Sequence, residues 1–380
     1  MDTGLQERVA GLLHEAGVRI GGTQPQDIQV HDPRFFARVM GQGSLGLGES
    51  YMEGWWDANV LDEFLAHLMQ AHLDERVHGW REVADALKAR LFNLQAGQGS
   101  YEVGRRHYDL GNDLYQAMLG QRLVYSCGYW RAAGDLDAAQ EAKLDLVCRK
   151  LGLEPGMTLL DIGCGWGSTI QRAVEKYDVN VIGLTLSENQ KQHIETNRFP
   201  NIDTTRSMEV RLQPWEDFEG KVDRIVSIGA FEHFGFNKYD DYMKKTYSWM
   251  PDDGVQMLHT IIIPSDEEIK AKKLPLTMSK VRFIKFIMDE IYPGGRLPLA
   301  AQVTDAATRN GYTVTREQHL QPHYVKTLDT WAANLKDKKD EAIEITSEEI
   351  YERFYKYLTG CADLFRDGYT DVVQFTMEKQ

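Results

Sequence analysis

Long hydrophobic runs are missing from this sequence of 380 residues. A membrane-spanning helix needs roughly 18 consecutive apolar residues, and no stretch approaches that length. The first residues also lack the basic segment and the apolar core of an export signal. We therefore expect a cytoplasmic protein that is neither exported nor inserted in a membrane.

Paired cysteines and an excess of positive charge are missing as well. The four cysteines lie far apart without a CxxC spacing, which argues against a zinc site or a secreted disulfide framework. The formal net charge is -14, so nucleic acid and anionic lipid would both repel the chain on average. We expect no nucleic-acid partner, and any membrane contact must depend on a local apolar or basic face.

The composition that remains, 42% hydrophobic and 26% charged, is typical of a globular protein, and the length favours two domains. Residues 1 to about 90 carry apolar residues at helical spacing, with no strand pattern between them. Two such runs contain Val9, Leu12 and Leu13, and then Leu61, Phe64, Leu65 and Leu68. The polar stretch 93–100 is the expected linker. This predicts a helical domain over 1–95 and a second domain over 101–380.

An aromatic cluster follows a glycine-rich stretch between the two helical runs. The cluster consists of Tyr51, Met52, Trp55 and Trp56. Aromatic residues beside a turn are usually buried, which favours a role in the core. An exposed patch that faces lipid is the alternative.

The pattern changes from about Leu151, where apolar β-rich runs alternate with amphipathic helical stretches. The runs are TLLDIG, NVIGLTLS, RIVSIGAF and VQMLHTIII. This alternation predicts a doubly wound α/β sheet. A last helical stretch is expected from Ser347 to Phe365.

The run TLLDIG leads into glycines at every second position, Gly163, Gly165 and Gly167, and then into a helix. Glycine lets the backbone turn sharply and approach a ligand closely, as the first β-α turn of a cofactor site requires. Asp161 precedes these glycines, and the longer phosphate-binding turn is absent. Both features favour a ligand with an amino acid and adenosine but no pyrophosphate. A purely structural turn is the alternative.

This segment resembles motif I of the class I S-adenosylmethionine methyltransferases, although the next strand ends in Thr185, Leu186 and Ser187 without the usual acidic residue. Seven ordered strings resemble the cyclopropane fatty acid synthases: YSCGYW, DIGCGWGS, GLTLSENQ, SIGAFEHFG, LHTI, LQPHYVKTLDTW and YLTGCADLF. The resemblance implies an enzyme that transfers a methylene group from S-adenosylmethionine to the cis double bond of a lipid acyl chain.

The resemblance differs along the chain. Up to about residue 110, GSLGLGESYMEGWW, ARLFNLQ and HYDLGND look like the bacterial phospholipid cyclopropane synthases. From about residue 150, strings such as RIVSIGAFEHFG and PGGRLP look closer to the mycolic acid cyclopropane synthases. The first part implies an unsaturated phospholipid substrate, peripheral contact with the inner face of the membrane, and a homodimer. A mycolic-type acyl substrate is the alternative.

Methyl transfer to an alkene leaves a carbocation, and ring closure then needs a base. The family is understood to use a bound bicarbonate ion. Carried over by motif, its cage would be formed by Cys127, Glu232, His259, Ile261 through its backbone, and Tyr324, with Cys361 counted among the catalytic residues. From the residues alone only Glu232 is indicated, because it ends an apolar strand of an open α/β sheet. His259 could equally be a core histidine, and Tyr324 has no independent signal.

The resemblance also assigns the cofactor contacts. Tyr125 and Ser126 would lie at the methionine end, Gly163 and Gly165 at the close backbone approach, Thr185, Leu186 and Gln190 at the ribose, and Trp215 and Glu216 at the adenine. Trp215 offers a ring for stacking, and Glu216 can accept from an amino group. Ordinary loop positions are the alternative for both residues.

Three aromatic residues, Tyr129, Phe231 and Phe234, are candidates to stabilise the carbocation, with plain core packing as the alternative. We expect Cys127 to be a wall of the anion site and not a nucleophile, because the alkene is electron-rich and YSCGYW supplies no base. Capture of water by the cation, or loss of a different proton, would give a branched product instead of a ring. A non-catalytic lipid-binding protein is a remote alternative, since the glycines and Glu232 are present.

Overall fold

The computed structural model describes residues 3–71, 112–272 and 295–379, together with 274, 280, 283, 284 and 286–292. The chain divides into two compact units, Met1–Gln95 with Lys273–Ile291, and Ala96–Lys272 with Tyr292–Gln380. The predicted linker at 93–100, the string ARLFNLQ and most of HYDLGND lie outside the described residues. The proposed domain boundary therefore stays a prediction.

In the first unit, the described part of Met1–Gln95 contains three helices and a small sheet. They are α1 (Thr3–Glu15), β1 (Ile28–Val30), α2 (Arg34–Met52), β2 (Trp56–Ala58) and α3 (Leu61–Gln70). The prediction that no strand interrupts the helices is wrong, because β1 pairs antiparallel with β2 and sets Ile28 opposite Ala58. Strands of three residues are too short to show an alternating pattern, so only their pairing in the folded unit reveals them.

The glycine-rich stretch is part of helix α2, not a turn. Each glycine weakens a helix by about 1 kcal/mol, but α2 buries Phe35, Leu47 and Tyr51 in the core of the unit, and this packing outweighs the propensity. The Trp56 ring is 2% exposed and its indole N–H donates to the Leu47 carbonyl at 3.0 Å. The core interpretation is thus confirmed for Tyr51 and Trp56, while Trp55 is half-buried.

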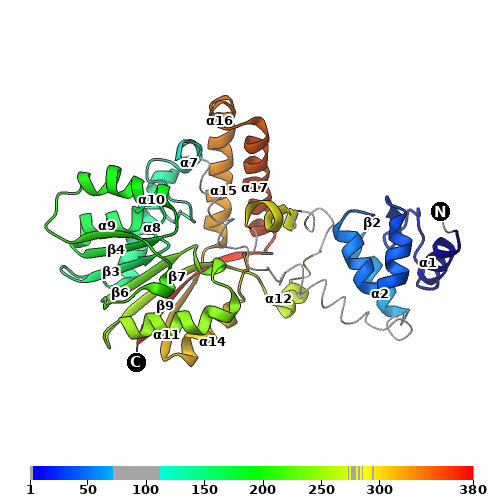
Figure 1. Cartoon of the computed structure of the whole chain (residues 1–380), viewed down its shortest axis with the longest axis horizontal. Coiled ribbons are helices and arrows are strands. Elements are labelled where there is room, and N and C mark those ends of the chain that lie inside the picture. The colour runs from blue at the N-terminus through cyan, green and yellow to red at the C-terminus, as the bar shows by residue number, and fades with distance from the viewer. Residues whose placement is uncertain are drawn as a thin grey trace. The chain divides into compact units, whose positions relative to one another are not determined.

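The second unit is built on a seven-stranded sheet with the order β5-β4-β3-β6-β7-β9-β8 (Figure 1). Its strands are β3 (Thr158–Ile162), β4 (Asn180–Thr185), β5 (Met208–Leu212), β6 (Arg224–Ile228), β7 (Val255–Ile262), β8 (Tyr312–His319) and β9 (Asp371–Lys379). All neighbours pair in parallel except β9, which is antiparallel to both β7 and β8. This confirms the predicted α/β fold and the four predicted strands. Strands β5, β8 and β9 were not predicted.

Helices cover both faces of this sheet (Figure 1). The longer described ones are α7 (Asn112–Leu119), α8 (Leu136–Leu151), α9 (Ser168–Tyr177), α11 (Tyr239–Trp249), α14 (Ala300–Arg309), α15 (Gln321–Asp337) and α17 (Glu348–Arg366). Shorter ones are α10 (Glu188–His193), α12 (Asp266–Ala271) and α16 (Lys339–Ile345), whereas the π-helical turn Ile287–Ile291 belongs to the first unit. Ser347 caps α17, as the predicted last helix requires. In the part of the chain described, no helix is long and apolar enough to cross a membrane.

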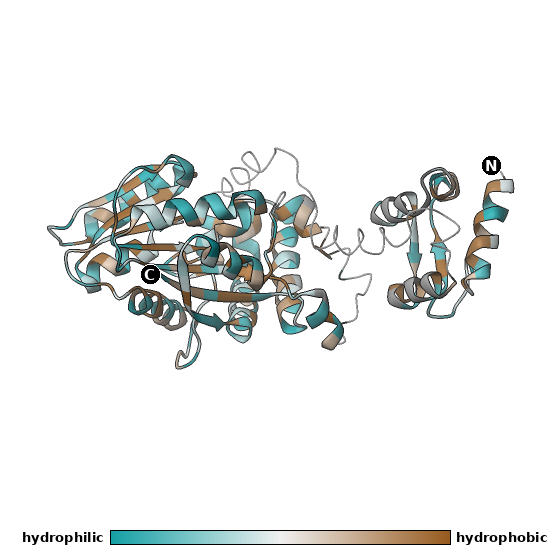
Figure 2. Cartoon of the chain, turned by 90° about the horizontal axis from the view of Figure 1, so that it is seen from below, coloured by the Kyte–Doolittle hydropathy of each residue, from teal (hydrophilic) through white to brown (hydrophobic). Residues whose placement is uncertain are grey.

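Two cores hold these layers together. One packs α8 and α9 against Leu159, Val181 and Val226, and the other packs α11 and α14 against the opposite face of the same strands. Hydrophobic residues are frequent on the central strands, whereas helices alternate hydrophobic and hydrophilic residues along their length (Figure 2). Strands β3 to β7 run parallel to one another, so their carboxyl ends lie at one edge of the sheet, where an open α/β fold binds its ligand.

Candidate active site

The glycine turn follows β3, and each of its three glycines has a positive φ angle. Gly163, Gly165 and Gly167 have φ angles of +80°, +54° and +80°. A Cβ atom on Gly163 would lie 2.7 Å from the Cβ of Ala230, so that glycine is required by packing inside the protein. A Cβ on Gly165 would meet nothing within 4 Å. Open space over Gly165 fits a cradle for a ligand.

Asp161, in the strand before this turn, is a buried carboxyl group. It is 2% exposed, and its Oδ1 has no hydrogen-bond partner among the described residues. Burial raises its pKa to about 7, opposed by the charge of Lys143 on α8. An unpartnered buried carboxylate oxygen fits the ammonium group at the methionine end of S-adenosylmethionine.

Lys143 is a second buried charged group that sequence reasoning missed. It is 1% exposed, and its ammonium donates to Ser126 Oγ at 3.1 Å. Burial lowers the pKa of Lys143 to about 8, opposed by Cys127 and Asp161. The structure thus brings the predicted cofactor residue Ser126 and Asp161 to one cation. A lysine in an amphipathic helix gives no sequence signal for such a role.

The predicted ribose residues lie at the end of β4. The Thr185 hydroxyl donates to Gln190 Oε1 at 2.7 Å, and Ser187 caps α10 by accepting from the Gln190 backbone N–H. Leu186 between them is 46% exposed. The turn therefore presents hydroxyl and amide groups beside an exposed apolar side chain, in place of the usual acidic residue.

The two predicted adenine residues differ in their surroundings. Trp215 is buried, with its ring 5.3 Å from each of the rings of Phe234 and Tyr242. The Glu216 carboxylate accepts from Lys238 at 2.6 Å. Trp215 therefore already packs against aromatic neighbours, and Glu216 would have to share its carboxylate between Lys238 and an adenine amino group.

Glu232 lies just after β6 and is 6% exposed. Its Oε1 accepts from the backbone N–H of Ile261 at 2.7 Å, while Oε2 is buried and has no hydrogen-bond partner in the described residues. Burial raises the pKa of this carboxyl group, opposed by the Ile261 N–H. An unpartnered carboxyl oxygen can hold or accept a proton here. The Ile261 N–H is already used by Glu232, which limits its predicted role as a donor to an anion.

His259 lies on β7 and is 2% exposed. Burial, together with the charges of Lys143 and Lys150, lowers its pKa well below the ordinary value. Its Nδ1 lies 3.1 Å from the side-chain nitrogen of Gln374 on β9. The imidazole is therefore neutral and hydrogen-bonded at one nitrogen. Gln374 could not be singled out from the sequence because β9 was not predicted.

Tyr324 brings several predicted residues together. Burial first, and then Tyr292, Cys127, Cys361 and Glu232, raise its pKa well above the ordinary value. The Cys127 thiol donates to the Gly128 carbonyl at 3.2 Å, and burial raises its pKa. Burial also raises the pKa of Cys361. Both cysteines are therefore protonated thiols.

A group of tyrosines adds to this region. The Tyr292 hydroxyl lies 2.8 Å from that of Tyr357 and donates to that of Tyr125 at 3.5 Å. Tyr125 also packs its ring 5.5 Å from Trp331. Tyr292 was missed because residues so distant in sequence carry no common signal, whereas Tyr357 lies inside the string YLTGCADLF.

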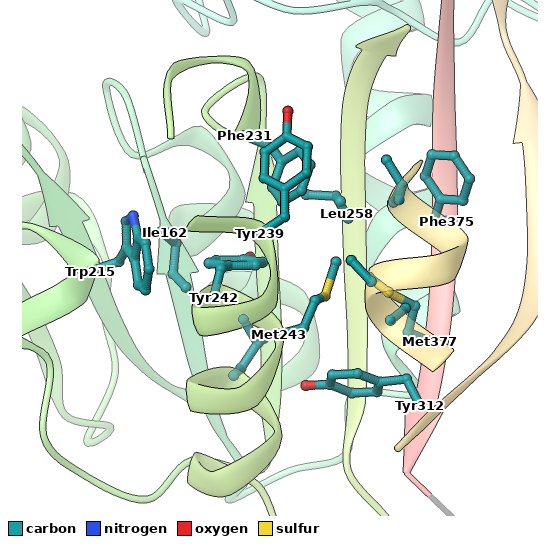
Figure 3. Close-up of a cluster of buried hydrophobic side chains, with 14 of the residues drawn as sticks. Ile162, Trp215, Phe231, Tyr239, Tyr242, Met243, Leu258, Tyr312, Phe375 and Met377 are labelled. Carbon is teal, nitrogen blue, oxygen red and sulfur yellow. The ribbon is translucent and has the colours of Figure 1, made fainter. Parts of the chain in front are cut away.

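The three aromatic candidates for stabilising the carbocation differ in what their rings pack against. Phe231 is fully buried in a hydrophobic core and stacks on Tyr239 with a centroid distance of 4.0 Å (Figure 3). Phe234 packs on the same core. The Tyr129 ring lies 4.8 Å from that of His323. These contacts favour the core interpretation for Phe231 and Phe234.

Comparisons with known proteins show which family the chain belongs to. The family model described as mycolic acid cyclopropane synthetase matches residues 95–375. Cyclopropane mycolic acid synthase 1 of Mycobacterium tuberculosis is 52% identical over 296 residues, which is 78% of this chain and 99% of that protein.

Two solved structures resemble the chain closely. The cyclopropane synthase MmaA2 from Mycobacterium tuberculosis has a TM-score of 0.72 at 50% identity, covering 75% of this chain and 99% of that one. Mycolic acid cyclopropane synthase CmaA1, complexed with SAH and CTAB, has a TM-score of 0.71 at 52% identity and covers 76% of this chain and all of that one.

Proposed function

Because the chain belongs to the mycolic acid cyclopropane synthetase family, we propose that it converts the cis double bond of a phospholipid acyl chain into a cyclopropane ring. Membership in the family makes the chain an S-adenosylmethionine-dependent methyltransferase that acts on lipid acyl chains. The observation that supports the ring-forming step best is Glu232, a buried carboxyl group with one unpartnered oxygen.

The cofactor would bind at the end of β3 and β4. Asp161 Oδ1 would accept from its ammonium group, and Gly165 would let the backbone lie against it. Thr185, Gln190 and the exposed Leu186 would border the ribose. When bound, S-adenosylmethionine supplies an electrophilic methyl group. These residues would hold the methyl in line with the alkene and exclude water. Because an alkene is a weak nucleophile, positioning and exclusion of water supply most of the rate acceleration.

The proton of the added methyl must leave for the ring to close. Glu232 Oε2 is available to hold that proton or to fix an acceptor, since Oε1 is held by the Ile261 N–H. Bicarbonate, when bound, would supply a proton acceptor that resists alkylation. His259 and Tyr324 would donate to such an anion, and the neutral state of both side chains suits donors.

Cys127 completes the wall of the site without taking part in bond formation. Its thiol is buried and its pKa is raised, so the thiolate that a nucleophile needs is not formed at neutral pH. Cys361 lies beside Tyr324 and Tyr357, whose pKa values it raises further. We assign both cysteines to the shape of the site.

The phospholipid substrate is supported by the part of the chain that the family match leaves out. The match begins at residue 95, so residues 1–94 are an addition to the family core. We propose that residues 1–95 form a domain for lipid access and assembly, that the protein contacts the membrane peripherally, and that it forms a homodimer. Residues 1–90 hold 8 Lys and Arg against 14 Asp and Glu, so attraction to anionic lipid is not the mechanism.

Mass spectrometry of lipids tests this function. Cells that contain unsaturated phospholipids and express the protein should gain one CH₂ per modified acyl chain, and the variant Glu232→Gln should not produce this gain. A gain of CH₂ plus water would identify a hydroxylated branch instead, and nuclear magnetic resonance of the product would distinguish a ring from a methylene branch. Unchanged phospholipids in the presence of soluble protein would contradict the proposal.

A mycolic-type acyl chain is the second candidate substrate, favoured by the 52% identity to a cyclopropane mycolic acid synthase. Purified protein should be given S-adenosylmethionine with either vesicles of unsaturated phospholipid or a long-chain unsaturated fatty acyl thioester. Turnover on the vesicles alone supports the phospholipid. Turnover on the thioester alone supports the mycolic-type substrate.

A further inference from the structure

We infer that Gln374 and Lys150 are positioning residues that keep the proton of the His259 imidazole on Nε2. The three side chains come from β9, α8 and β7, on the sheet face that α8 covers. His259 and Gln374 are opposite each other in the antiparallel β7–β9 pair, and they are 2% and 0% exposed. Their contact is therefore a direct cross-strand pair without access to bulk water.

Lys150 decides which way the Gln374 amide points. The Lys150 nitrogen lies 2.7 Å from Gln374 Oε1. An ammonium group has only donors, so its partner must be the amide oxygen and not the amide nitrogen. Gln374 Nε2 is then the atom that faces His259, at 3.1 Å from Nδ1.

The amide nitrogen in turn decides the tautomer of the ring. An amide N–H₂ can only donate, so His259 Nδ1 must accept and carries no proton. Burial and the charges of Lys143 and Lys150 keep the imidazole neutral. A neutral imidazole without a proton on Nδ1 has its proton on Nε2.

This chain of hydrogen bonds gives His259 one defined donor. The inference rests on the proposed function, in which His259 donates a hydrogen bond to an anion. With Nδ1 protonated instead, Nε2 would present a lone pair and would repel the anion. Lys150 and Gln374 touch neither cofactor nor substrate in this scheme and act only through the ring.

The tautomer can be measured directly. Nitrogen-15 shifts of selectively labelled histidines distinguish a protonated from an unprotonated ring nitrogen, and the His259→Asn variant identifies the His259 signals. The spectra should be recorded below the pKa of Lys150, which burial lowers to about 7. We expect Nε2 protonated and Nδ1 unprotonated in the full-length protein. A protonated Nδ1, alone or together with Nε2, would overturn the inference.

The variant Gln374→Glu should reverse the tautomer. The introduced carboxylate can accept hydrogen bonds both from Lys150 and from a protonated Nδ1. The imidazole proton therefore moves from Nε2 to Nδ1, without a change in side-chain size. We expect kcat to fall by at least about tenfold while the Kd for S-adenosylmethionine stays within about twofold. Lys150→Met, which releases the amide, should give a mixture of tautomers, and it serves if the first variant does not fold.

The matched control is Gln256→Glu. Like Gln374, Gln256 is a fully buried glutamine, but it lies on β7 and forms hydrogen bonds with Tyr242 and Tyr312 on the opposite face of the sheet. A carboxylate there should leave the His259 tautomer unchanged. If Gln374→Glu folds and reverses the tautomer but keeps full turnover, or if it leaves the tautomer as in the wild type, the positioning role is wrong. If tautomer and turnover change as expected but bicarbonate does not stimulate the wild type, the inference holds and the proposed anion is wrong.

Discussion

The active site has two ends, one that would bind the cofactor and one that would handle the proton. Each end buries a carboxyl group with one unpartnered oxygen, but a different group opposes the effect of burial on its pKa. At the cofactor end, the nearby charge of Lys143 opposes the effect of burial on Asp161. At the other end, the backbone N–H of Ile261 opposes the effect of burial on Glu232. An end with an added cation suits the binding of the charged amino-acid part of the cofactor, whereas a carboxyl group held by neutral donors suits the handling of a proton.

The construction of the two ends differs too. The cofactor end is built on the glycine turn directly after β3, to which the end of β4 adds Thr185 and helix α8 adds Lys143. The other end combines the ends of β6 and β7 with α15 and α17. Changes at the first end should therefore alter affinity for the cofactor, and changes at the second should alter turnover.

The largest effect is expected from Glu232→Gln. The amide cannot take up a proton, so kcat should fall by about 10³-fold while the Kd for S-adenosylmethionine is unchanged. Initial rates on phospholipid vesicles and calorimetry measure the two quantities. Cys127→Ser is the matched comparison and should keep kcat within about tenfold, because the thiol forms no bond to substrate. A dead serine variant beside an active Gln variant would place the thiol at the centre of the chemistry.

The next largest effect is expected from Gly165→Asn. Asparagine tolerates the left-handed backbone at φ +54°, but its side chain would fill the open space where the cofactor lies, so we expect a Kd about 100-fold higher by calorimetry. Gly152→Asn is the control, since Gly152 has φ +58°, open space and a position at the end of α8. Equal affinity in the two variants would remove Gly165 from the cofactor site.

Asp161→Asn should weaken cofactor binding less than Gly165→Asn does, and it should make the protein more stable relative to the wild type as the pH rises. Loss of the charged acceptor should raise the Kd for S-adenosylmethionine about tenfold. The folded-state pKa of Asp161 is raised from 3.8 to about 7, so the stability it contributes is complete below pH 3.8 and is lost as pH rises through 7. The amide never ionises.

Without cofactor, the unfolding free energy of this variant should therefore gain on that of the wild type between pH 4 and pH 7, as measured by urea denaturation. A constant difference between the two proteins across this range would show that the Asp161 carboxyl does not titrate there. An unchanged Kd would remove Asp161 from the cofactor site. The two buried carboxyl groups would then no longer differ as a cofactor-binding group and a proton-handling group.

The first unit provides the smallest expected effect, because none of the residues assigned to either end belongs to it. Trp55 is half-buried, with the guanidinium groups of Arg34 and Arg38 at 4.4 and 4.7 Å from its ring centroid. Trp55→Ala should lower binding to phospholipid vesicles by about threefold or less and leave the Kd for S-adenosylmethionine unchanged. Unchanged vesicle binding and activity on bilayers would assign Trp55 to the surface of the unit alone.

Trp56→Ala is the contrasting change, because this ring is in the core. It should destabilise the first unit by about 3 to 5 kcal/mol in urea denaturation, whereas Trp55→Ala should cost little. The two neighbouring tryptophans thus separate a role in folding from a role at the surface. Equal losses of stability would contradict the burial that distinguishes them.

The sequence by itself determined the features that depend on neighbours along the chain. The α/β fold followed from the alternation of strands and helices, and the glycine turn followed from the spacing of Gly163, Gly165 and Gly167, because both patterns repeat over a few residues. The place of Glu232 followed in the same way from the apolar strand that precedes it. Other site residues, such as Tyr324, were available only through family resemblance.

Only the tertiary structure decided which distant groups share one environment. Strand pairing sets Gln374 opposite His259, and the packing of α8 on the sheet brings Lys143 to Asp161 and Ser126. In the first unit, packing in the core stabilises a glycine-rich stretch as part of helix α2. It also buries the side chain of Trp56 more completely than that of Trp55. The physical reason is that burial and charge act through space, so hydrogen-bond partners and pKa shifts depend on neighbours that the order of residues does not reveal.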